Sequence, residues 1–304
     1  KKSKNGGFIW GLVFLLISGF LLGSFWWLYN LWQDIYVTVA PEEQLPGLGD
    51  SQNKRESLPD VLTVLLLGLD SMDGVSRTDA IMVLSLHKSG EMSLVSIPRD
   101  MRVEIPGHGL DKINHAHAYG GVPLVLKTVE EFLDIKIDHY ATTDFEGFVN
   151  IIDILGGIEI DVEKKMYHKG KDVTIDLQPG LQVLNGEKAL QYVRFRSDSE
   201  GDFGRVRRQQ QLVKVLAAEV LRPANLLKIP RLLPEVAQNV RTDLELNQAL
   251  ILAGKLKDLN LGEINSITLP GKSGNINGVS YVIPDDEKIA ELVDCYINFT
   301  RSTA

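Results

Sequence analysis

The longest apolar stretch of the chain lies near its N-terminus, where Phe8–Tyr29 reads FIWGLVFLLISGFLLGSFWWLY without a charge. A helix of this length can cross about 30 Å of hydrocarbon. Lys1, Lys2 and Lys4 precede the stretch and Asp34 follows it, so the positive-inside rule places the N-terminus in the cytoplasm. A cleaved signal peptide normally has a shorter apolar core, and a buried globular helix would show a polar face. The pattern therefore predicts one transmembrane helix.

This span divides the chain into four parts. Residues 1–7 form a cytoplasmic stub and residues 8–29 the transmembrane helix. Residues 30–59 are a juxtamembrane segment and linker, because Pro41–Pro59 is polar, contains prolines and lacks a hydrophobic period. Residues 60–304 are left as one extracytoplasmic domain. We therefore expect a single-pass protein of the cell membrane whose folded part lies outside the cytoplasm.

Short apolar segments after the linker predict strands. Val61–Gly68 is a continuous apolar run, which is typical of a strand buried on both faces. Asp79–Leu86 and Met92–Ile97 alternate between apolar and polar residues, and the polar segment between them indicates a hairpin. Ile158–Val162 reads as a further strand. The sheet is therefore expected to be mixed and partly antiparallel.

Helical periodicity dominates the rest of the chain. The predicted helices are Val122–Leu133, Phe145–Leu155, Gly186–Tyr192, Gly204–Leu221, Asn247–Leu259 and Asp285–Phe299. Gly156 and Gly157 form a typical stop for the second of these helices. Strands mixed with helices over this length predict a single α/β/α sandwich domain, with helices on both faces of the sheet.

Composition narrows the possible functions. The chain has 304 residues, is 44% hydrophobic and carries a formal charge of −8, which argues against general nucleic-acid binding. Its single cysteine, Cys295, excludes an internal disulfide framework and a multi-cysteine metal site. His115 and His117 are too few for a zinc site without further ligands nearby. Neither a G-x-S-x-G elbow nor a phosphate-binding glycine loop occurs in the sequence.

Two aspartates stand at the ends of neighbouring predicted strands. Asp70 follows the buried run Val61–Gly68, and Asp79 opens the next strand. A hairpin would bring the two carboxylates together, and carboxylate oxygens suit Mg²⁺, which completes its shell with water and substrate phosphates. The alternative is an ordinary turn in which Asp79 pairs with Arg77.

Arginines gather at two further places in this acidic chain. Arg99 follows the strand Met92–Ile97 and would point toward the same sheet edge as Asp70. All five basic residues between positions 194 and 208 are arginines: Arg194, Arg196, Arg205, Arg207 and Arg208. Guanidinium groups bind phosphate oxygens in pairs, and a helix N-terminus adds positive potential.

The expected arrangement of this arginine segment is an anion clamp. Arg194 and Arg196 share one face if the chain is extended after Tyr192. Asp202 is expected to cap the following helix, and Arg205, Arg208 and Gln209 would then lie on one side of it. The alternative is a solvated charged face paired with neighbouring acidic residues.

These motifs, in this order after one N-terminal span, resemble the LytR–CpsA–Psr family of bacterial cell-envelope proteins. The matching stretches are LLLGLD with RTDAIM, SIPRDM, KINHAHAYGG, and LNGEKALQYVRFRSD followed by DFGRVRRQQQ. The resemblance implies a phosphotransferase that moves a phosphoglycan, a teichoic-acid-like or capsular polymer, from a polyprenyl-pyrophosphate carrier to a peptidoglycan hydroxyl.

The resemblance also assigns roles to residues. Asp70 and Asp79 would hold Mg²⁺, with Mn²⁺ as the alternative ion. Arg99, Arg194, Arg196 and Arg205 would hold the pyrophosphate, with Asp202 and Gln209 supporting the site. Substrate-contacting motif positions without an individually derived role are Arg77, Asp100, Lys112, Asn114 and Arg208. The lipid would need an apolar groove, for which Val122–Leu133, Phe145–Leu155 and Leu212–Leu221 are candidates.

Two other functions remain open at this level. A metal-dependent hydrolase could split the lipid pyrophosphate with water and use the same residues. A non-enzymatic envelope protein that binds lipid or glycan would be a regulator and not a catalyst. The sequence leaves open the glycopolymer, the acceptor sugar and the oligomeric state.

Overall fold

The computed structural model describes residues 29–30, 33, 59–70, 77–170, 174–245, 248–249, 252 and 264–300. The predicted span Phe8–Tyr29 lies outside this set apart from Tyr29, and the predicted helix Asn247–Leu259 lies mostly outside it. No helix in the described part of the chain is both long and apolar enough to span a membrane.

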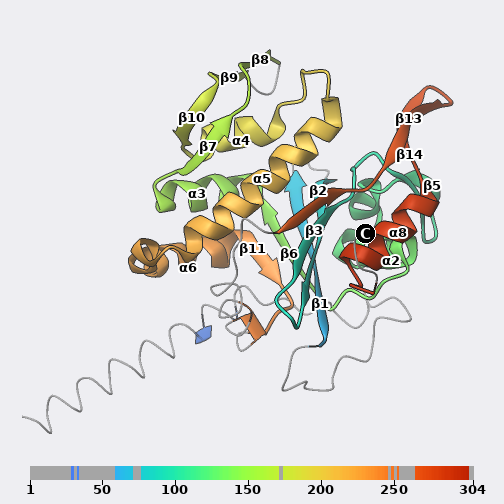
Figure 1. Cartoon of the computed structure of the whole chain (residues 1–304), viewed down its shortest axis with the longest axis horizontal. Coiled ribbons are helices and arrows are strands. Elements are labelled where there is room, and N and C mark those ends of the chain that lie inside the picture. The colour runs from blue at the N-terminus through green and yellow to red at the C-terminus, as the bar shows by residue number, and fades with distance from the viewer. Residues whose placement is uncertain are drawn as a thin grey trace, which may run out of the picture.

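The domain is built on a mixed six-stranded sheet with the order β11-β6-β1-β2-β3-β12 (Figure 1). Its strands are β1 (Val61–Asp70), β2 (Arg77–His87), β3 (Met92–Ser96), β6 (His139–Asp144), β11 (Val240–Thr242) and β12 (Asn265–Thr268). The β1–β2, β2–β3 and β6–β11 pairs are antiparallel, whereas β1–β6 and β3–β12 are parallel. The predicted mixed α/β architecture is therefore confirmed.

Helices cover both faces of this sheet. The main helices are α2 (His115–Leu133), α3 (Phe145–Leu155), α4 (Gly186–Arg194), α5 (Gly201–Leu221), α6 (Ile229–Asn239) and α8 (Asp286–Tyr296), with a 3₁₀ helix η2 (Pro223–Lys228) before α6. The side chains of α2 and α8 share one core with alternate residues of β1, β2 and β3. Helix α5 packs against the residues of the opposite face.

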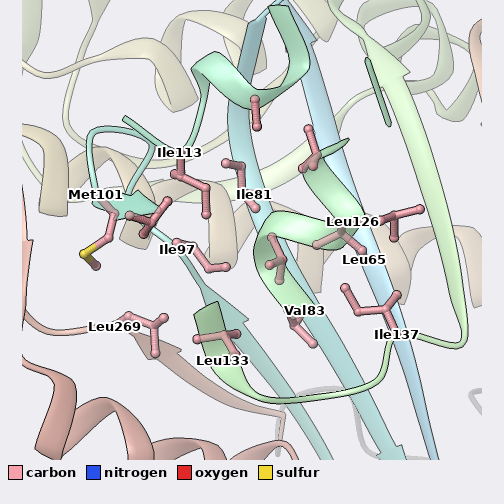
Figure 2. Packing of buried hydrophobic residues seen from close by; sticks show 14 of the residues in the cluster. Leu65, Ile81, Val83, Ile97, Met101, Ile113, Leu126, Leu133, Ile137 and Leu269 are labelled. Carbon is pink, nitrogen blue, oxygen red and sulfur yellow. The ribbon is translucent and has the colours of Figure 1, made fainter. Parts of the chain in front are cut away.

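The core under α2 shows why the predicted strands form. Leu65 and Leu67 of β1 and Ile81 and Val83 of β2 alternate onto this face and are almost fully buried. Figure 2 shows Leu65, Ile81 and Val83 near Leu126, Leu133 and Ile137, and Met101, Ile113 and Leu269 belong to the same cluster. Burial of this apolar surface is the main favourable contribution to folding of the sheet.

Four small antiparallel pairs extend from this sandwich. They are β4 (Arg102–Ile105) with β5 (Gly109–Lys112), β7 (Ile158–Val162) with β10 (Gly180–Leu184), β8 (Met166–Lys169) with β9 (Thr174–Leu177), and β13 (Gly271–Ile276) with β14 (Val279–Pro284). The strand predicted at Ile158–Val162 is thus correct, but it pairs with β10 and not with the six-stranded sheet.

Several predicted helix boundaries are also correct. Helix α3 has the predicted bounds, and Gly156 ends it in the left-handed conformation at φ 89°. Helix α8 begins after Asp285, whose side chain accepts a hydrogen bond from Lys288 N. Helix α2 starts seven residues before the predicted Val122, because a kink at Gly120 and Gly121 joins two helical segments.

Candidate active site

The candidate site lies at one edge of the six-stranded sheet. Strands β1, β3, β6 and β12 run in the same direction, so their carboxyl ends meet at this edge together with the start of β2. Such strand ends are the usual place for ligand sites in open α/β sheets. Asp70 ends β1, and Arg99 follows β3 after two residues.

A β-bulge sets the position of Asp79. Gly68 pairs with Ala80 and Leu69 pairs with Thr78, so Asp79 is an extra residue of β2 with no partner in the register. The two strands approach closely here, since a Cβ atom on Gly68 would lie only 3.1 Å from the Ala80 Cβ. Bulges of this kind redirect a side chain beside a functional site. Asp70 pairs with Arg77 just beyond the bulge.

Asp79 and Arg99 form a half-buried ion pair at this edge. The Asp79 Oδ1 atom accepts a hydrogen bond of 2.6 Å from Arg99 Nη1, and both side chains are about one fifth exposed. Burial acts to lower the pKa of Arg99, but its interactions with Asp79, Asp100 and Asp202 outweigh burial and raise it. Arg99 therefore stays a cation.

Asp100 and Lys112 extend the pair into a charged chain. Asp100 Oδ1 accepts a hydrogen bond of 2.7 Å from Lys112 Nζ, and Asp100 Oδ2 lies 3.7 Å from Arg99 Nε. The backbone is fixed as well, because Asp100 O accepts from Val282 N and Arg99 O accepts from Asn114 N. This part of the site is thus held by β5 through Lys112, by β14 through Val282 and by the N-cap residue of α2, Asn114.

The first turns of α5 add a second cation. The side chain of Arg205 is only 6% exposed and lies 3.0 Å from Asp202 Oδ1 in an ion pair. Burial, together with the nearby positive charge of Arg99, lowers the pKa of Arg205. Asp202 lies in the first turn and does not cap the helix, whose N-cap residue is Glu200. The predicted capping role of Asp202 is therefore wrong, because the helix begins earlier.

Both guanidinium groups have an unused donor. The Nε atoms of Arg99 and Arg205 are buried and make no hydrogen bond to the described residues. The 3.7 Å contact of Arg99 Nε with Asp100 is too long for a hydrogen bond, and the 3.0 Å ion pair between Arg205 and Asp202 Oδ1 lacks hydrogen-bond geometry. Leaving a buried polar group unpaired costs about 1 to 3 kcal/mol, and more for charged groups. Two buried guanidinium groups whose charges influence each other, each with an Nε donor that makes no hydrogen bond, indicate a site that is completed by an anionic ligand.

Gln210 fixes α5 against the sheet. This buried side chain donates from Nε2 to Ser96 Oγ at 2.8 Å and to Ile267 O at 2.7 Å. It therefore ties α5, the helix that carries Arg205, to the ends of β3 and β12. The sequence motif predicts a role for the neighbouring Gln209, which is only half-buried. The sequence pattern does not distinguish the two glutamines, because the helix phase is set by tertiary packing.

Arg194 and Arg196 take different positions. Arg194 is the last residue of α4, and its guanidinium carbon lies 5.1 Å from the ring centre of Phe145, which follows β6 at the same sheet edge. The predicted extended chain after Tyr192 is wrong, because α4 continues to Arg194. Arg196 follows in the loop and is exposed.

Arg208 is fully buried in a network of its own. Its Nε donates to Glu163 Oε1 at 2.8 Å, its Nη1 to Phe195 O at 2.8 Å, and its Nη2 to Asp198. These contacts join α5 to β7 and to the loop that carries Arg196. The structure therefore places Arg208 beside that loop and not among Arg99, Arg205 and Asp79.

The remaining motif residues surround the cluster. Arg77 is exposed next to Asp70 in the β1–β2 register. Asn114 is buried, and its Oδ1 has no donor within the described segments. His115 is bonded to Asp111 Oδ2 at 2.8 Å.

The carboxylates of the site are too few to bind a metal ion alone, so phosphate oxygens of a substrate would have to complete its coordination. No group of three His, Cys, Asp or Glu side chains with a metal-binding arrangement occurs in the described ranges. Asp70 and Asp79 lie on neighbouring strands at one edge, which gives two carboxylates. Two carboxylates fit Mg²⁺, because this ion binds through one or two of them and completes its shell with phosphates and water.

The chain is similar to proteins of one family over most of its length. The LytR_cpsA_psr family model matches residues 32–296. A curated relative from Halalkalibacterium halodurans, "Polyisoprenyl-teichoic acid--peptidoglycan teichoic acid transferase TagU", is 33% identical over 93% of this chain and 94% of its own. The Staphylococcus aureus "Regulatory protein MsrR" is 43% identical over 174 residues, 56% of this chain and 52% of its own.

Solved structures agree with this similarity. The crystal structure of Bacillus subtilis TagV matches with a TM-score of 0.69 and 31% identity, covering 79% of this chain and 99% of that chain. The "LytR-CPS2A-psr family protein YwtF (TagT) with bound octaprenyl pyrophosphate lipid" matches with a TM-score of 0.63 and 31% identity. That match covers 84% of this chain and 96% of the other.

Proposed function

Since the chain belongs to the LytR–CpsA–Psr family, we propose that it is a phosphotransferase that moves a teichoic-acid-like or other anionic glycopolymer from a polyprenyl-pyrophosphate carrier to a peptidoglycan hydroxyl. The observation that carries this proposal is the pair of buried guanidinium groups of Arg99 and Arg205, each with an Nε donor that makes no hydrogen bond to the described residues. They are held beside Asp79 and Asp202 at the sheet edge. A relative with this fold contains octaprenyl pyrophosphate lipid, which is an anion of the required kind.

The reaction exchanges a phosphoanhydride bond of the carrier's pyrophosphate for a phosphoester bond to the acceptor. The acceptor hydroxyl oxygen attacks the phosphorus that carries the glycan, and the bond from that phosphorus to the bridging oxygen breaks. Polyprenyl monophosphate leaves, and a phosphodiester joins glycan and acceptor. The hydroxyl proton passes to a carboxylate, for which Asp79 and Asp202 are the candidates at the cluster.

The protein's contribution is mainly positioning and charge neutralisation, as in other phosphoryl transfers. Arg99 and Arg205 hold the diphosphate oxygens through their free donors. Arg194, whose position is fixed on the Phe145 ring, contributes positive charge from the β6 side. Asp79 orients Arg99 through their 2.6 Å hydrogen bond. These groups stabilise the negative charge that develops on the leaving phosphate.

Asp70 and Asp79 are the residues that would hold Mg²⁺ in this proposal. Their carboxylates lie on paired strands beside Arg99. A bound magnesium ion would neutralise phosphate charge beyond what the arginines supply. Asp79 would then serve both the ion and Arg99.

The lipid chain is proposed to lie along the α5 face of the sheet. Several apolar residues on this face are only partly buried, namely Leu66, Ala80, Leu84, Val213, Ala217 and Leu221. In contrast, Leu124, Val125 and Val129 of α2 are buried in the opposite core. Of the candidate helices for an apolar groove, α5 therefore fits better than α2. The segment Phe8–Tyr29 would anchor the protein to the membrane that contains the lipid.

A reconstituted assay tests the function. The full chain in detergent micelles receives a lipid-linked glycopolymer donor and Mg²⁺, with or without peptidoglycan oligomers. We expect glycan on the acceptor and release of prenyl phosphate that depends on the acceptor. Arg99→Ala and Arg205→Ala should lower the rate at least 100-fold, whereas Arg222→Ala, which removes a surface arginine, should not. Release at the same rate without acceptor would identify a hydrolase instead.

A further inference from the structure

An aromatic cluster outside the phosphate site occupies the surface next to it. The rings of His108 and Tyr119 are stacked, with centres 4.4 Å apart and planes inclined by 10°. His108 is exposed and Tyr119 is 46% exposed. His115 lies edge-on to Tyr119 at 6.1 Å. The stacked pair therefore presents aromatic ring surface to solvent.

Polar contacts hold these rings in place. Asp111 Oδ2 accepts a hydrogen bond of 2.7 Å from the Tyr119 hydroxyl and lies 2.8 Å from His115 Nδ1. Burial acts to raise the pKa of Asp111, but the hydrogen bonds from His115 and Tyr119 outweigh it and lower it. Asp111 is therefore an anion that holds the side chains of Tyr119 and His115 in place.

Cationic side chains border the cluster on the β13–β14 side. The guanidinium of Arg102 and the ammonium of Lys112 each lie 5.7 Å from the centre of the Tyr281 ring. Figure 1 shows the β13–β14 hairpin in the same region as β5, and these contacts connect the two. The rim thus offers N–H donors beside exposed ring surface.

This surface is continuous with the phosphate site. Lys112, next to Asp111 in β5, donates to Asp100, which in turn pairs with Arg99. Tyr119 also lies close enough to Arg77 and Tyr281 for their charges to influence its pKa, which the hydrogen bond to Asp111 raises. Strand β5 therefore links the aromatic cluster, through Asp111, to the phosphate site, through Lys112.

Given the proposed function, on which this step rests, we propose that His108 and Tyr119 form a stacking platform for a pyranose ring of the acceptor glycan. The C–H face of a pyranose is weakly positive and packs against the negative face of an aromatic ring. Arg102 and Lys112 supply donors for sugar hydroxyl and acetamido oxygens. The occupant is an uncharged N-acetylhexosamine strand, because the buried arginines already take the anionic part of the donor.

The direction of the reaction favours the acceptor over the donor's own sugar. Attacking and leaving oxygens lie roughly in line at the transferring phosphorus. The leaving prenyl phosphate lies on the α5 side in the proposed arrangement. The hydroxyl must then approach from the opposite side, where α2 and the β4–β5 hairpin carry Tyr119 and His108.

Direct binding provides the first test. Saturation-transfer NMR with the full chain in micelles measures contact with an N-acetylglucosamine tetrasaccharide. We expect binding by the parent protein, and at least tenfold weaker binding by Tyr119→Ala and His108→Ala. Tyr167→Ala is the matched control, because this tyrosine is 57% exposed on the distant β8. Equal binding by all variants would overturn the platform.

Kinetics assign the sugar to one substrate. With the transfer assay, Tyr119→Ala should raise the KM for the acceptor at least tenfold and leave the KM for the lipid-linked donor unchanged. A rise in the donor KM alone would overturn the assignment to the acceptor. If the parent protein fails to transfer glycan, the proposed function is wrong. Binding of the tetrasaccharide that still depends on Tyr119 would in that case show a glycan-binding site in a protein that is not a transferase.

Discussion

The guanidinium of Arg208 donates a 2.8 Å hydrogen bond to the carbonyl oxygen of Phe195. This bond joins the fully buried side chain of α5 to the loop after α4, on which Arg196 lies. The same guanidinium binds Glu163 and Asp198. Arg208 thus links the two halves of the arginine segment without itself lying in the Arg99–Arg205 cluster.

Arg208→Ala should destabilise the fold strongly. Removing one partner of a buried ion pair leaves uncompensated charge and costs about 3 to 5 kcal/mol. Such a loss corresponds to a fall in Tm on the order of 10 °C for a domain of this size. Thermal melting of the full chain in micelles measures it. The neighbouring Arg207 is 45% exposed, so Arg207→Ala should lower Tm by only a few degrees. Equal Tm values for Arg208→Ala and Arg207→Ala would contradict the structural role of Arg208.

The same network predicts how stability depends on pH. Burial acts to raise the pKa of Asp198 and of Glu163, but the hydrogen bonds from neighbouring cations outweigh it and lower both. A carboxyl with a lowered folded-state pKa stabilises the fold above its unfolded pKa of about 4 and loses this contribution as the pH falls. The Tm difference between the parent and Arg208→Ala should therefore shrink as the pH falls from 6 to 3. A constant difference would argue against ionised partners.

Arg205→Met should separate binding from stability. Arg205 is a nearly buried cation whose pKa is lowered by burial and by Arg99, so its removal relieves an unfavourable desolvation. We expect a Tm at or above that of the parent. A saturating prenyl diphosphate should raise the parent's stability by about 2.7 kcal/mol at a hundredfold excess over Kd. Arg205→Met should lose most of that gain; an unchanged ligand-induced shift would refute the clamp.

Magnesium should act through Asp70 and Asp79. Titrating the protein with prenyl diphosphate, once in buffer with Mg²⁺ and once in buffer with EDTA, gives the magnesium-dependent part of the affinity. Asp70→Asn should remove this part while the binding seen in EDTA persists. Asp79→Asn should in addition weaken binding in EDTA, because Arg99 loses its 2.6 Å partner. Asp60→Asn, at a 78% exposed surface pair, is the control. Equal magnesium dependence in Asp70→Asn and the parent would refute the metal assignment.

Local pattern predicts most of the fold and part of the site. A continuous apolar run identifies β1, alternation identifies β2 and β3, and helical periodicity identifies α3. The strand ends suggest that Arg99 and Asp70 share an edge. The bulge at Asp79 is not visible in the sequence, because it arises from the pairing of Gly68 with Ala80. Bulges depend on which residues meet across two strands, and local propensity does not encode that choice.

Helix phase is the second feature that local pattern misses. Arg205 and Arg208 are three positions apart and were expected on one side of α5. The structure separates their partners, because Arg205 pairs with Asp202 while Arg208 pairs with Glu163, directly after β7. Which neighbour covers each side of a helix depends on tertiary packing. For the same reason the sequence predicts a site role for Gln209 and misses Gln210.

The two adjacent glutamines provide the last prediction. Gln210→Met removes the donor that serves Ser96 Oγ and Ile267 O, and leaving such buried acceptors unpaired costs about 1 to 3 kcal/mol. The loss should lower Tm and also weaken prenyl diphosphate binding, because Gln210 anchors the helix that carries Arg205. Gln209→Met should keep the Tm of the parent, since its half-buried side chain does not hold α5 to the sheet. If Gln209→Met lowers Tm as much as Gln210→Met, the anchor is not specific to Gln210, and the position of Arg205 must be set by other contacts.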